Sequence, residues 1–194
     1  NTIFDGFYTG VSGGWTWGFA PANTGNNRIV GNRIFNIGFG VLCDMGGIYT
    51  LGEHLGSVIS GNHINGVYRH RYGGWGIYND EGSRGFVVEN NYVHDVAEDS
   101  YHQHYGKNNT VRNNVFVCGG TSQIALSSDA PNPKLSKNDI SRNIAVRDNV
   151  IYRYGRYDKA GVGVLYLDVH DISVEHNTIF DGFYTGVSGG WTWG

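Results

Sequence analysis

The sequence contains little proline, little cysteine and little charge. Its 194 residues include only 3 Pro and 2 Cys, against 31 Gly. So much glycine indicates a turn-rich chain, but the three-residue period of collagen and the composition of a low-complexity linker are both absent. Cys43 and Cys118 are too distant in sequence to suggest a metal-binding knuckle, and a disulfide between them cannot be inferred. We find no signal peptide and no apolar run of membrane-spanning length.

Charge is too sparse for a nucleic-acid-binding surface. Charged residues make up 16 % of the chain and the formal net charge is −3, so we expect neither nucleic acid nor a membrane as a partner. Aromatic residues are abundant at 14 %, and such side chains present flat apolar faces on which sugar rings can stack. We expect an extracellular or cell-surface location, with any export signal outside these residues, and no cofactor.

Eighteen residues occur twice without a substitution. Residues 1–18 and residues 177–194 both read NTIFDGFYTGVSGGWTWG, at an offset of 176 residues. Divergence does not leave eighteen positions untouched by chance. We therefore interpret 1–176 as one repeat unit, natural or engineered, and 177–194 as the start of the next. A fold whose first layer equals its last can continue into another copy of itself.

A shorter repeat is centred on one asparagine. Its copies read alike, as in VISGNHIN around Asn62 and AVRDNVIY around Asn149. Successive copies lie 23 to 35 residues apart, and six such steps fill the 176-residue unit. A period of this length indicates a solenoid, a propeller or an array. The marked positions are Asn1, Asn32, Asn62, Asn91, Asn114, Asn149 and Asn177.

Apolar residues alternate with polar ones on both sides of this asparagine. Around Asn62, for example, Ile59 stands three positions before and Ile64 two positions after. Period-two alternation excludes a helical repeat, and the repeats are too short for the four strands of a propeller blade. Asn tolerates the left-handed backbone of a bend, and stacked Asn side chains can hydrogen-bond between layers. We predict one all-β domain over 1–194, a right-handed parallel β-helix with about six coils per unit and an asparagine ladder.

A second strand is expected in most coils. In the triplets 15–17, 47–49 and 76–78 the middle residue would point inward, so that Trp17, Tyr49 and Tyr78 would point outward, stacked at about 4.8 Å. Such a ladder could equally well only brace the coils. The direction of Tyr166 in a fourth triplet is left open. Coils four and five are expected to break the pattern, and residues 127–139, with two of the three prolines, predict a protruding loop.

Three segments in consecutive coils carry more polar and aromatic residues than a scaffold needs. They read CDMGGIYTLGEH (43–54), YGGWGIYNDEGSRG (72–85) and YHQHYGKNN (101–109). Following SGGWTWG in the first coil, this order resembles the right-handed parallel β-helix proteins grouped with β-helical glycoside hydrolases, which include fucosidases and xylanases. The likeness covers roughly residues 1–118. It implies an active site of two aspartates on neighbouring coils, which correspond here to Asp44 and Asp80, although the family members are longer and have more coils.

Glycoside hydrolysis requires two carboxyl groups across the bond that is cleaved. Asp44, Asp80 and Glu81 are the candidates. Asp44 precedes its expected strand whereas Asp80 follows its own, so the sequence does not say whether the two approach within the roughly 5–10 Å that catalysis requires. The alternative is that these carboxylates are ordinary turn residues, since Asp beside Gly is common in turns.

Two histidines alternate in the third segment. His102 and His104 would face the same side of a strand, near His54 or Asp80, where they could bind a metal or hydrogen-bond to sugar hydroxyls. Zinc requires three or four ligands and the sequence guarantees two, so we expect no metal. The candidate sugar-contacting residues are Trp15, Trp17, Tyr49, His54, Trp75, Tyr78, His102, His104 and Tyr105.

These patterns support three functions. The one that we favour from the sequence is structural: a solenoid unit that continues end to end into a fibre or tandem array, because open strand edges pair readily and the duplication has no enzymatic explanation. The second is a glycoside hydrolase acting on a polysaccharide. The third is a carbohydrate-binding module without catalysis. The expected partners are copies of the same chain and, for the last two functions, a polysaccharide.

Overall fold

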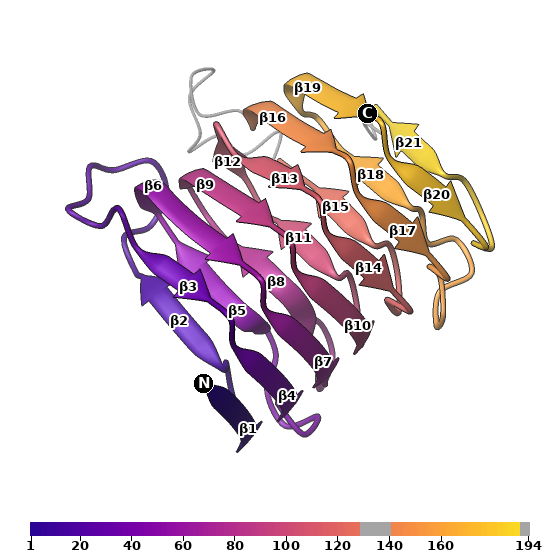
Figure 1. The fold of residues 1–194 in the computed structure, drawn as a ribbon, viewed down its shortest axis with the longest axis horizontal. Helices are drawn as coiled ribbons and strands as arrows, with labels where there is room; N and C mark the ends of the chain where they lie inside the picture. Colours follow the sequence, from indigo (N-terminus) through magenta and orange to yellow (C-terminus); the bar gives the residue numbers. More distant parts are fainter. Residues whose placement is uncertain (129–140, 191–194) are drawn as a thin grey trace.

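The chain winds into a stack of short parallel strands (Figure 1). The computed structural model describes residues 1–128 and 141–190. Three sheets run along the stack, and successive strands of the chain fall in the first, second and third sheet in turn, except that the fourth coil contributes two strands to the third sheet. No described segment forms a helix that is long and apolar enough to cross a membrane.

All strand pairs within the three sheets are parallel, which confirms the predicted parallel β-helix. The first sheet contains β1 (Thr2–Gly6), β4 (Arg33–Ile37), β7 (His63–Val67), β10 (Tyr92–Val96), β14 (Val115–Val117), β17 (Val150–Tyr152) and β20 (Thr178–Phe180). The second contains β2 (Val11–Gly14), β5 (Gly46–Leu51), β8 (Trp75–Asn79), β11 (Tyr101–Gln103), β15 (Ile124–Leu126), β18 (Val164–Tyr166) and β21 (Val187–Gly189). The third contains β3 (Arg28–Val30), β6 (Glu53–Ser60), β9 (Ser83–Glu89), β12 (Gly106–Lys107), β13 (Thr110–Arg112), β16 (Arg142–Arg147) and β19 (His170–Glu175).

The predicted asparagine ladder forms at the corner between the third and first sheets. The side-chain nitrogen of each asparagine donates to the Oδ1 of the next, as Asn62 does to Asn91 at 3.0 Å. From Asn62 in the third coil onward, this nitrogen also reaches back to a carbonyl, which for Asn91 is that of Ile59 at 3.0 Å. Buried amides that satisfy one another hold successive coils in register. The ladder runs through Asn1, Asn32, Asn62, Asn91, Asn114, Asn149 and Asn177.

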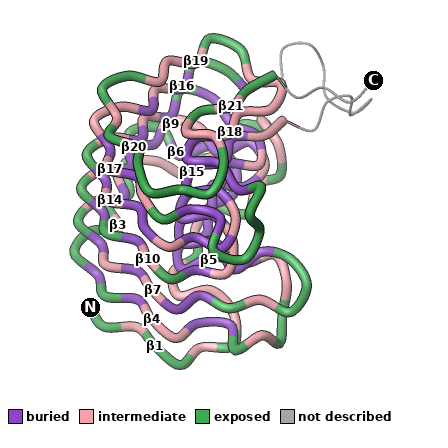
Figure 2. Tube along the Cα trace, turned by 90° about the vertical axis from the view of Figure 1, so that its right-hand side faces the viewer, coloured by how far each residue is buried: buried purple, intermediate pink, exposed green. Residues whose placement is uncertain are grey.

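Apolar side chains on both sides of this corner fill the interior. Ile59 and Ile64 are fully buried, and Figure 2 shows more exposed residues in the first and last coils than in the middle ones. The interior is narrow where the strands of the second sheet begin. A Cβ on Gly76 would lie 2.3 Å from Val93 Cγ1 and 2.5 Å from the carbonyl oxygen of Ser100, so only glycine fits there without a shift.

The predicted position of the first strand of the second sheet is wrong. It is β2, in which Ser12 pairs with Tyr49, and not the triplet that ends at Trp17. The backbone takes φ values of 103° at Gly14 and 82° at Trp15, which are not strand values, so the strand ends before the triplet. Trp17 therefore does not stack above Tyr49.

The second sheet also continues where a break was expected. Coils four and five contribute β11 and β15 to it. The outward column that begins with Tyr49 and Tyr78 passes through His102 to Leu165, so Tyr166 falls on the other face and packs against the core. The loop expected over 127–139 lies outside the described residues from position 129 onward.

The two identical segments occupy equivalent places in the first and last layers. β20 and β21 hold, at the last layer, the positions of β1 and β2 at the first, although both are shorter. Asp5 and its copy Asp181 both take a left-handed conformation, with φ values of 58° and 56°. The six-coil spacing thus places one sequence in the same two sheets at both ends of the stack.

Candidate functional site

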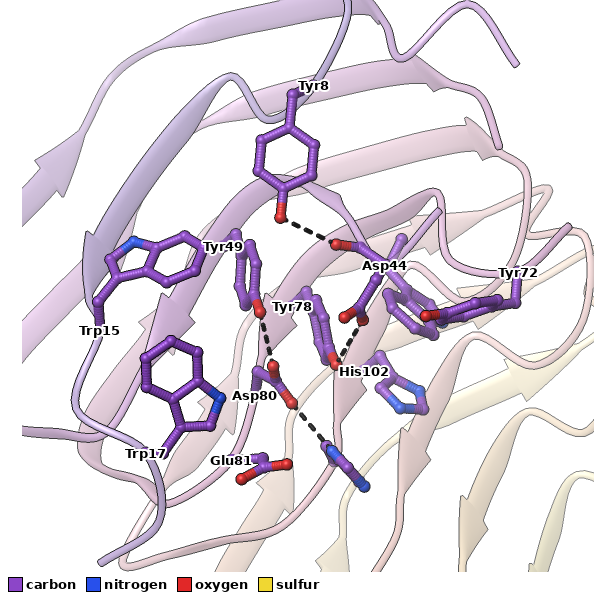
Figure 3. A pocket seen from close by; sticks show the side chains of 12 residues that line it. Tyr8, Trp15, Trp17, Asp44, Tyr49, Tyr72, Tyr78, Asp80, Glu81 and His102 are labelled. Carbon is purple, nitrogen blue, oxygen red and sulfur yellow. Dashed lines mark hydrogen bonds and ion pairs between the residues drawn. The ribbon is translucent and has the colours of Figure 1, made fainter. Parts of the chain in front are cut away.

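A cleft of about 410 Å³ opens on the outer face of the second sheet. Its floor is the outward column in which Tyr49, Tyr78 and His102 follow one another in register. The rings of Tyr49 and Tyr78 stack with their centroids 4.8 Å apart, as predicted. Figure 3 shows the side chains that line this cleft. The lining residues are Tyr8, Trp15, Trp17, Asp44, Tyr49, Tyr72, Trp75, Tyr78, Asp80, Glu81, His102 and His104.

Asp44 and Asp80 reach the cleft from opposite ends of neighbouring strands. Asp44 precedes β5 in a left-handed conformation, with φ of 56°, and Asp80 directly follows β8. The Tyr78 hydroxyl donates to Asp44 Oδ1 at 3.1 Å, and it also lies close enough to Asp80 to help lower the pKa of that carboxyl group. The fold therefore brings together the two aspartates that the resemblance singled out.

The surroundings drive the pKa values of these two carboxyl groups in opposite directions. Burial, followed by the charge of Asp80, raises the pKa of Asp44. Burial also acts to raise the pKa of Asp80, but hydrogen bonds from one histidine and two tyrosines outweigh it and lower that pKa. Tyr49 donates to Asp80 Oδ2 at 2.7 Å, and His104 Nδ1 lies 2.9 Å from Oδ1. As the pH rises, Asp80 thus ionises before Asp44.

The two tyrosines of the floor remain neutral donors. Burial is the main cause that raises the pKa of both Tyr49 and Tyr78, and the neighbouring Asp80 raises it further. A neutral phenol donates one hydrogen bond to a carboxylate, which stabilises the charged form of Asp80.

His102 and His104 face the same cleft, as the alternation predicts, although β11 ends at Gln103 and His104 directly follows it. Both line the cleft, and each is oriented by a carboxylate. His102 Nδ1 lies 2.9 Å from Asp99 Oδ2, and its ring stacks on Trp75 at 4.4 Å. His104 is held by Asp80 as described above. Fixed imidazoles of this kind can donate hydrogen bonds to sugar hydroxyls.

An aromatic wall faces the carboxylates across the cleft. Trp15 and Trp17 follow β2 and contact each other edge to face, with centroids 5.8 Å apart. Trp15 also lies 5.4 Å from the Tyr49 ring. Trp17 is 61 % exposed, which is unusual for so large an apolar side chain and leaves its surface free for a ligand.

Two of the sequence-predicted residues do not line the cleft. His54 is buried in β6, where its ring lies 4.7 Å from that of Phe86 and burial lowers its pKa. Tyr105 lies behind the rim, where its hydroxyl donates to Glu81 Oε2 at 2.8 Å. Tyr105 thus positions a lining residue without facing the cleft itself.

Three further residues belong to the site although sequence reasoning did not select them. The Tyr8 hydroxyl donates to the backbone carbonyl of Asp44 at 3.1 Å, and Tyr72 lines the rim. Asp99 orients His102. Tyr72 stands in one of the polar segments and Tyr8 in the duplicated segment, so their positions in the sequence could have suggested them as site residues. Nothing in the local pattern indicated that their side chains point toward the cleft.

The described residues provide no ligand set for a metal. None of their His, Cys, Asp and Glu side chains form a group of three or more placed to hold an ion. Carboxylate pairs with unequal pKa values can instead transfer protons and attack or polarise a carbon centre, which is the chemistry of acid–base hydrolysis.

Comparison with known proteins identifies the architecture. The family model described as "right handed beta helix region" matches residues 11–145 and, in a second overlapping register, residues 46–190. No curated protein gives a significant match. No solved structure does either.

Proposed function

The chain belongs to the family of right-handed β-helix regions, and on this scaffold we propose that the cleft cleaves glycosidic bonds in a polysaccharide. One observation carries the proposal: Asp44 and Asp80 line one cleft beside Tyr78 and have oppositely shifted pKa values. Glycosidases need one carboxyl group that keeps its proton and one that has lost it. The resemblance of the three polar segments and the exposed tryptophan wall support the same class of substrate.

The pKa shifts assign a role to each carboxyl group. Asp44, which holds its proton longer, donates that proton to the glycosidic oxygen as the leaving group departs. The Asp80 carboxylate attacks the anomeric carbon and forms a glycosyl ester. Water then cleaves the ester while Asp44 accepts the proton of that water. Glu81, held by Tyr105 at the rim, accepts a hydrogen bond from a sugar hydroxyl.

The separation of the carboxyl groups selects the stereochemical course. Retaining glycosidases hold them about 5–5.5 Å apart, whereas inverting ones leave about 6.5–9.5 Å for a water molecule. Asp44 and Asp80 both lie beside one side chain, Tyr78, which favours the shorter of the two spacings. We therefore expect the product to keep the configuration of the substrate.

The rate of cleavage should follow a bell-shaped pH profile with its maximum on the acid side. Activity requires ionised Asp80 and protonated Asp44. It is therefore lost as pH falls through the lowered pKa of Asp80 and as pH rises through the raised pKa of Asp44, on either side of about 3.9. The measurement is reducing-sugar release from a panel of plant and bacterial polysaccharides at pH values from strongly acidic to mildly alkaline, with the anomer identified by proton NMR.

Two results would contradict this proposal. If none of the polysaccharides is cleaved at any pH, the cleft is not hydrolytic. If one of them is bound but stays intact, the cleft is a carbohydrate-binding module, with Trp15, Trp17 and the stacked tyrosines as its platform.

A structural role is the second function that we propose, in which the solenoid continues into further copies as a fibre or tandem array. The observation that favours it is that the duplicated sequence packs against the following coil in its first copy and against the preceding coil in its second copy. In the first copy Phe4 stacks on Phe35 of the following coil at 5.2 Å. In the second copy its equivalent, Phe180, stacks on Tyr152 of the preceding coil at 4.9 Å. The same eighteen residues can therefore lie between the sixth coil of one unit and the second coil of the next.

A two-unit chain tests this structural role. A chain in which residues 1–176 precede a complete copy of 1–194 should form one rod, about 29 Å longer than the original because six layers are added at about 4.8 Å each. Small-angle scattering measures the length and calorimetry the number of unfolding transitions. Two bodies that reorient independently, or two separate transitions, would contradict a continuous solenoid.

A further inference from the structure

Within the described ranges, the two identical segments have unpaired strand edges on opposite sides. β1 pairs with β4 of the following coil, whereas β20 pairs with β17 of the preceding coil. Among the described residues, the far edge of β20 pairs with no other strand. That edge carries the groups that β1 uses to bind the second coil, because the two sequences are the same.

The ladder shows this equivalence in atomic terms. Asn1 Nδ2 donates to Asn32 Oδ1 at 2.9 Å. Asn177 uses its side-chain nitrogen to reach back to the carbonyl of Val146 at 2.9 Å, as the inner asparagines do toward their own preceding coils. The inner asparagines use the second hydrogen of the same nitrogen to donate to the next Oδ1. In another copy that next Oδ1 would be the one on Asn32.

We propose that residues 177–190 of one copy can replace residues 1–14 on the second coil of another copy, so that chains associate head to tail by exchanging one coil. This inference rests on the structural role above and extends it from one chain to separate chains. The incoming segment packs on the second coil just as the displaced segment did, because the two sequences are identical, and this is the condition for domain swapping. The covalent link favours the closed monomer by its high effective concentration, so exchange needs high protein concentration or a weakened first coil.

Exchange would also rebuild the cleft with a residue of the neighbour. Tyr8, whose hydroxyl donates to the carbonyl of Asp44, belongs to the displaced segment. Its copy Tyr184 is 54 % exposed and would take that place. The neighbouring chain would then supply one lining residue of the cleft, and each coil exchange would leave one complete cleft per unit.

Two equivalent glycines provide a matched test. A Cβ on Gly10 would lie 2.6 Å from Ile34 Cγ2 and 2.8 Å from the carbonyl oxygen of Gly47, so Gly10→Ala weakens docking of the first coil. A Cβ on Gly186 meets only Ile179 Cγ2 at 3.6 Å, which is an ordinary contact, so Gly186→Ala is tolerated in the monomer. In an exchanged chain, however, position 186 occupies the tight site of Gly10.

Sedimentation of the full-length variants over a range of micromolar concentrations gives the result. We expect Gly10→Ala to associate at a concentration at least about 10-fold lower than the unmodified chain, since weakening the closed form favours exchange. We expect the double variant Gly10→Ala/Gly186→Ala to return to the monomer, because both competing segments then carry the same clash. Gly186→Ala alone should remain monomeric.

These outcomes distinguish coil exchange between separate chains from the structural role of a continuous solenoid. A monomeric Gly10→Ala variant, or a double variant that associates equally well, would overturn coil exchange. Either result beside a two-unit chain that forms a single rod would leave the structural role intact. A two-unit chain that forms two independent bodies would overturn the structural role itself.

Discussion

Replacing Asp80 by Asn should lower kcat/KM for glycan cleavage on the order of 10³–10⁵-fold, which is the usual loss when a group that acts on the reacting atoms is removed. The substitution keeps the size of the side chain but removes the charge that attacks the anomeric carbon. Asp80 is buried, and its hydrogen bonds with Tyr49 and His104 favour its ionised form. An amide oxygen can accept one of these bonds but cannot act as a nucleophile. The measurement is the initial rate on the polysaccharide that the unmodified chain cleaves fastest.

Glu81→Gln is the matched control for this experiment. Glu81 also lines the cleft and is the next residue in the chain, but it is held at the rim by Tyr105. Losing one charge-assisted hydrogen bond there should cost about 10-fold or less. Equal losses for the two variants, at unchanged melting temperature, would show that general electrostatics and not the Asp44–Asp80 pair sustains cleavage.

Replacing Asn91 by Ala should lower the free energy of unfolding by about 3–6 kcal/mol, because several buried groups lose their partners at a cost of about 1–3 kcal/mol each. Asn91 Oδ1 accepts from both the backbone and the side-chain nitrogen of Asn62 at 3.0 Å. Its Nδ2 donates to the carbonyl of Ile59 and to Asn114 Oδ1. All these groups lie in the interior corner, where water does not replace them. Urea unfolding followed by tryptophan fluorescence measures the change.

Asn1→Ala provides the comparison at the end of the same ladder. Asn1 is exposed, and its side chain makes one ladder bond, to Asn32. Its loss should cost under about 1 kcal/mol because water can replace the partner. If Asn91→Ala were no more destabilising than Asn1→Ala, the ladder would be a consequence of the stacking of the coils and would not contribute to their stability.

The chain's own repeat explains why the fold could be predicted so far. Each inner asparagine directly follows a bend, and the left-handed residue is the one before it, as at Gly61 and Asn90, and not the asparagine that the sequence suggested. From Asn32 onward a β-branched residue stands three positions before the asparagine, and an apolar residue stands two after it. In a solenoid every layer contacts only its neighbours, so a local period is enough to set strand, bend and core face. Prediction was less accurate at the first strand of the second sheet, because Gly14 and Trp15 leave the β conformation too early for the pattern of Trp15 and Trp17.

The sequence alone determined the β-helix, the line of asparagines and the identity of the first and last layers. Only the tertiary structure decided that Asp44 and Asp80 line one cleft beside Tyr78, that His54 lies in the interior, and that Tyr8 from another coil joins the cleft. The physical reason is that a period fixes which layer and face a residue occupies, whereas side chains across a cleft meet through the lengths and φ angles of the connecting loops. Those angles, such as the left-handed one at Asp44, follow from packing between coils and not from any periodic signal.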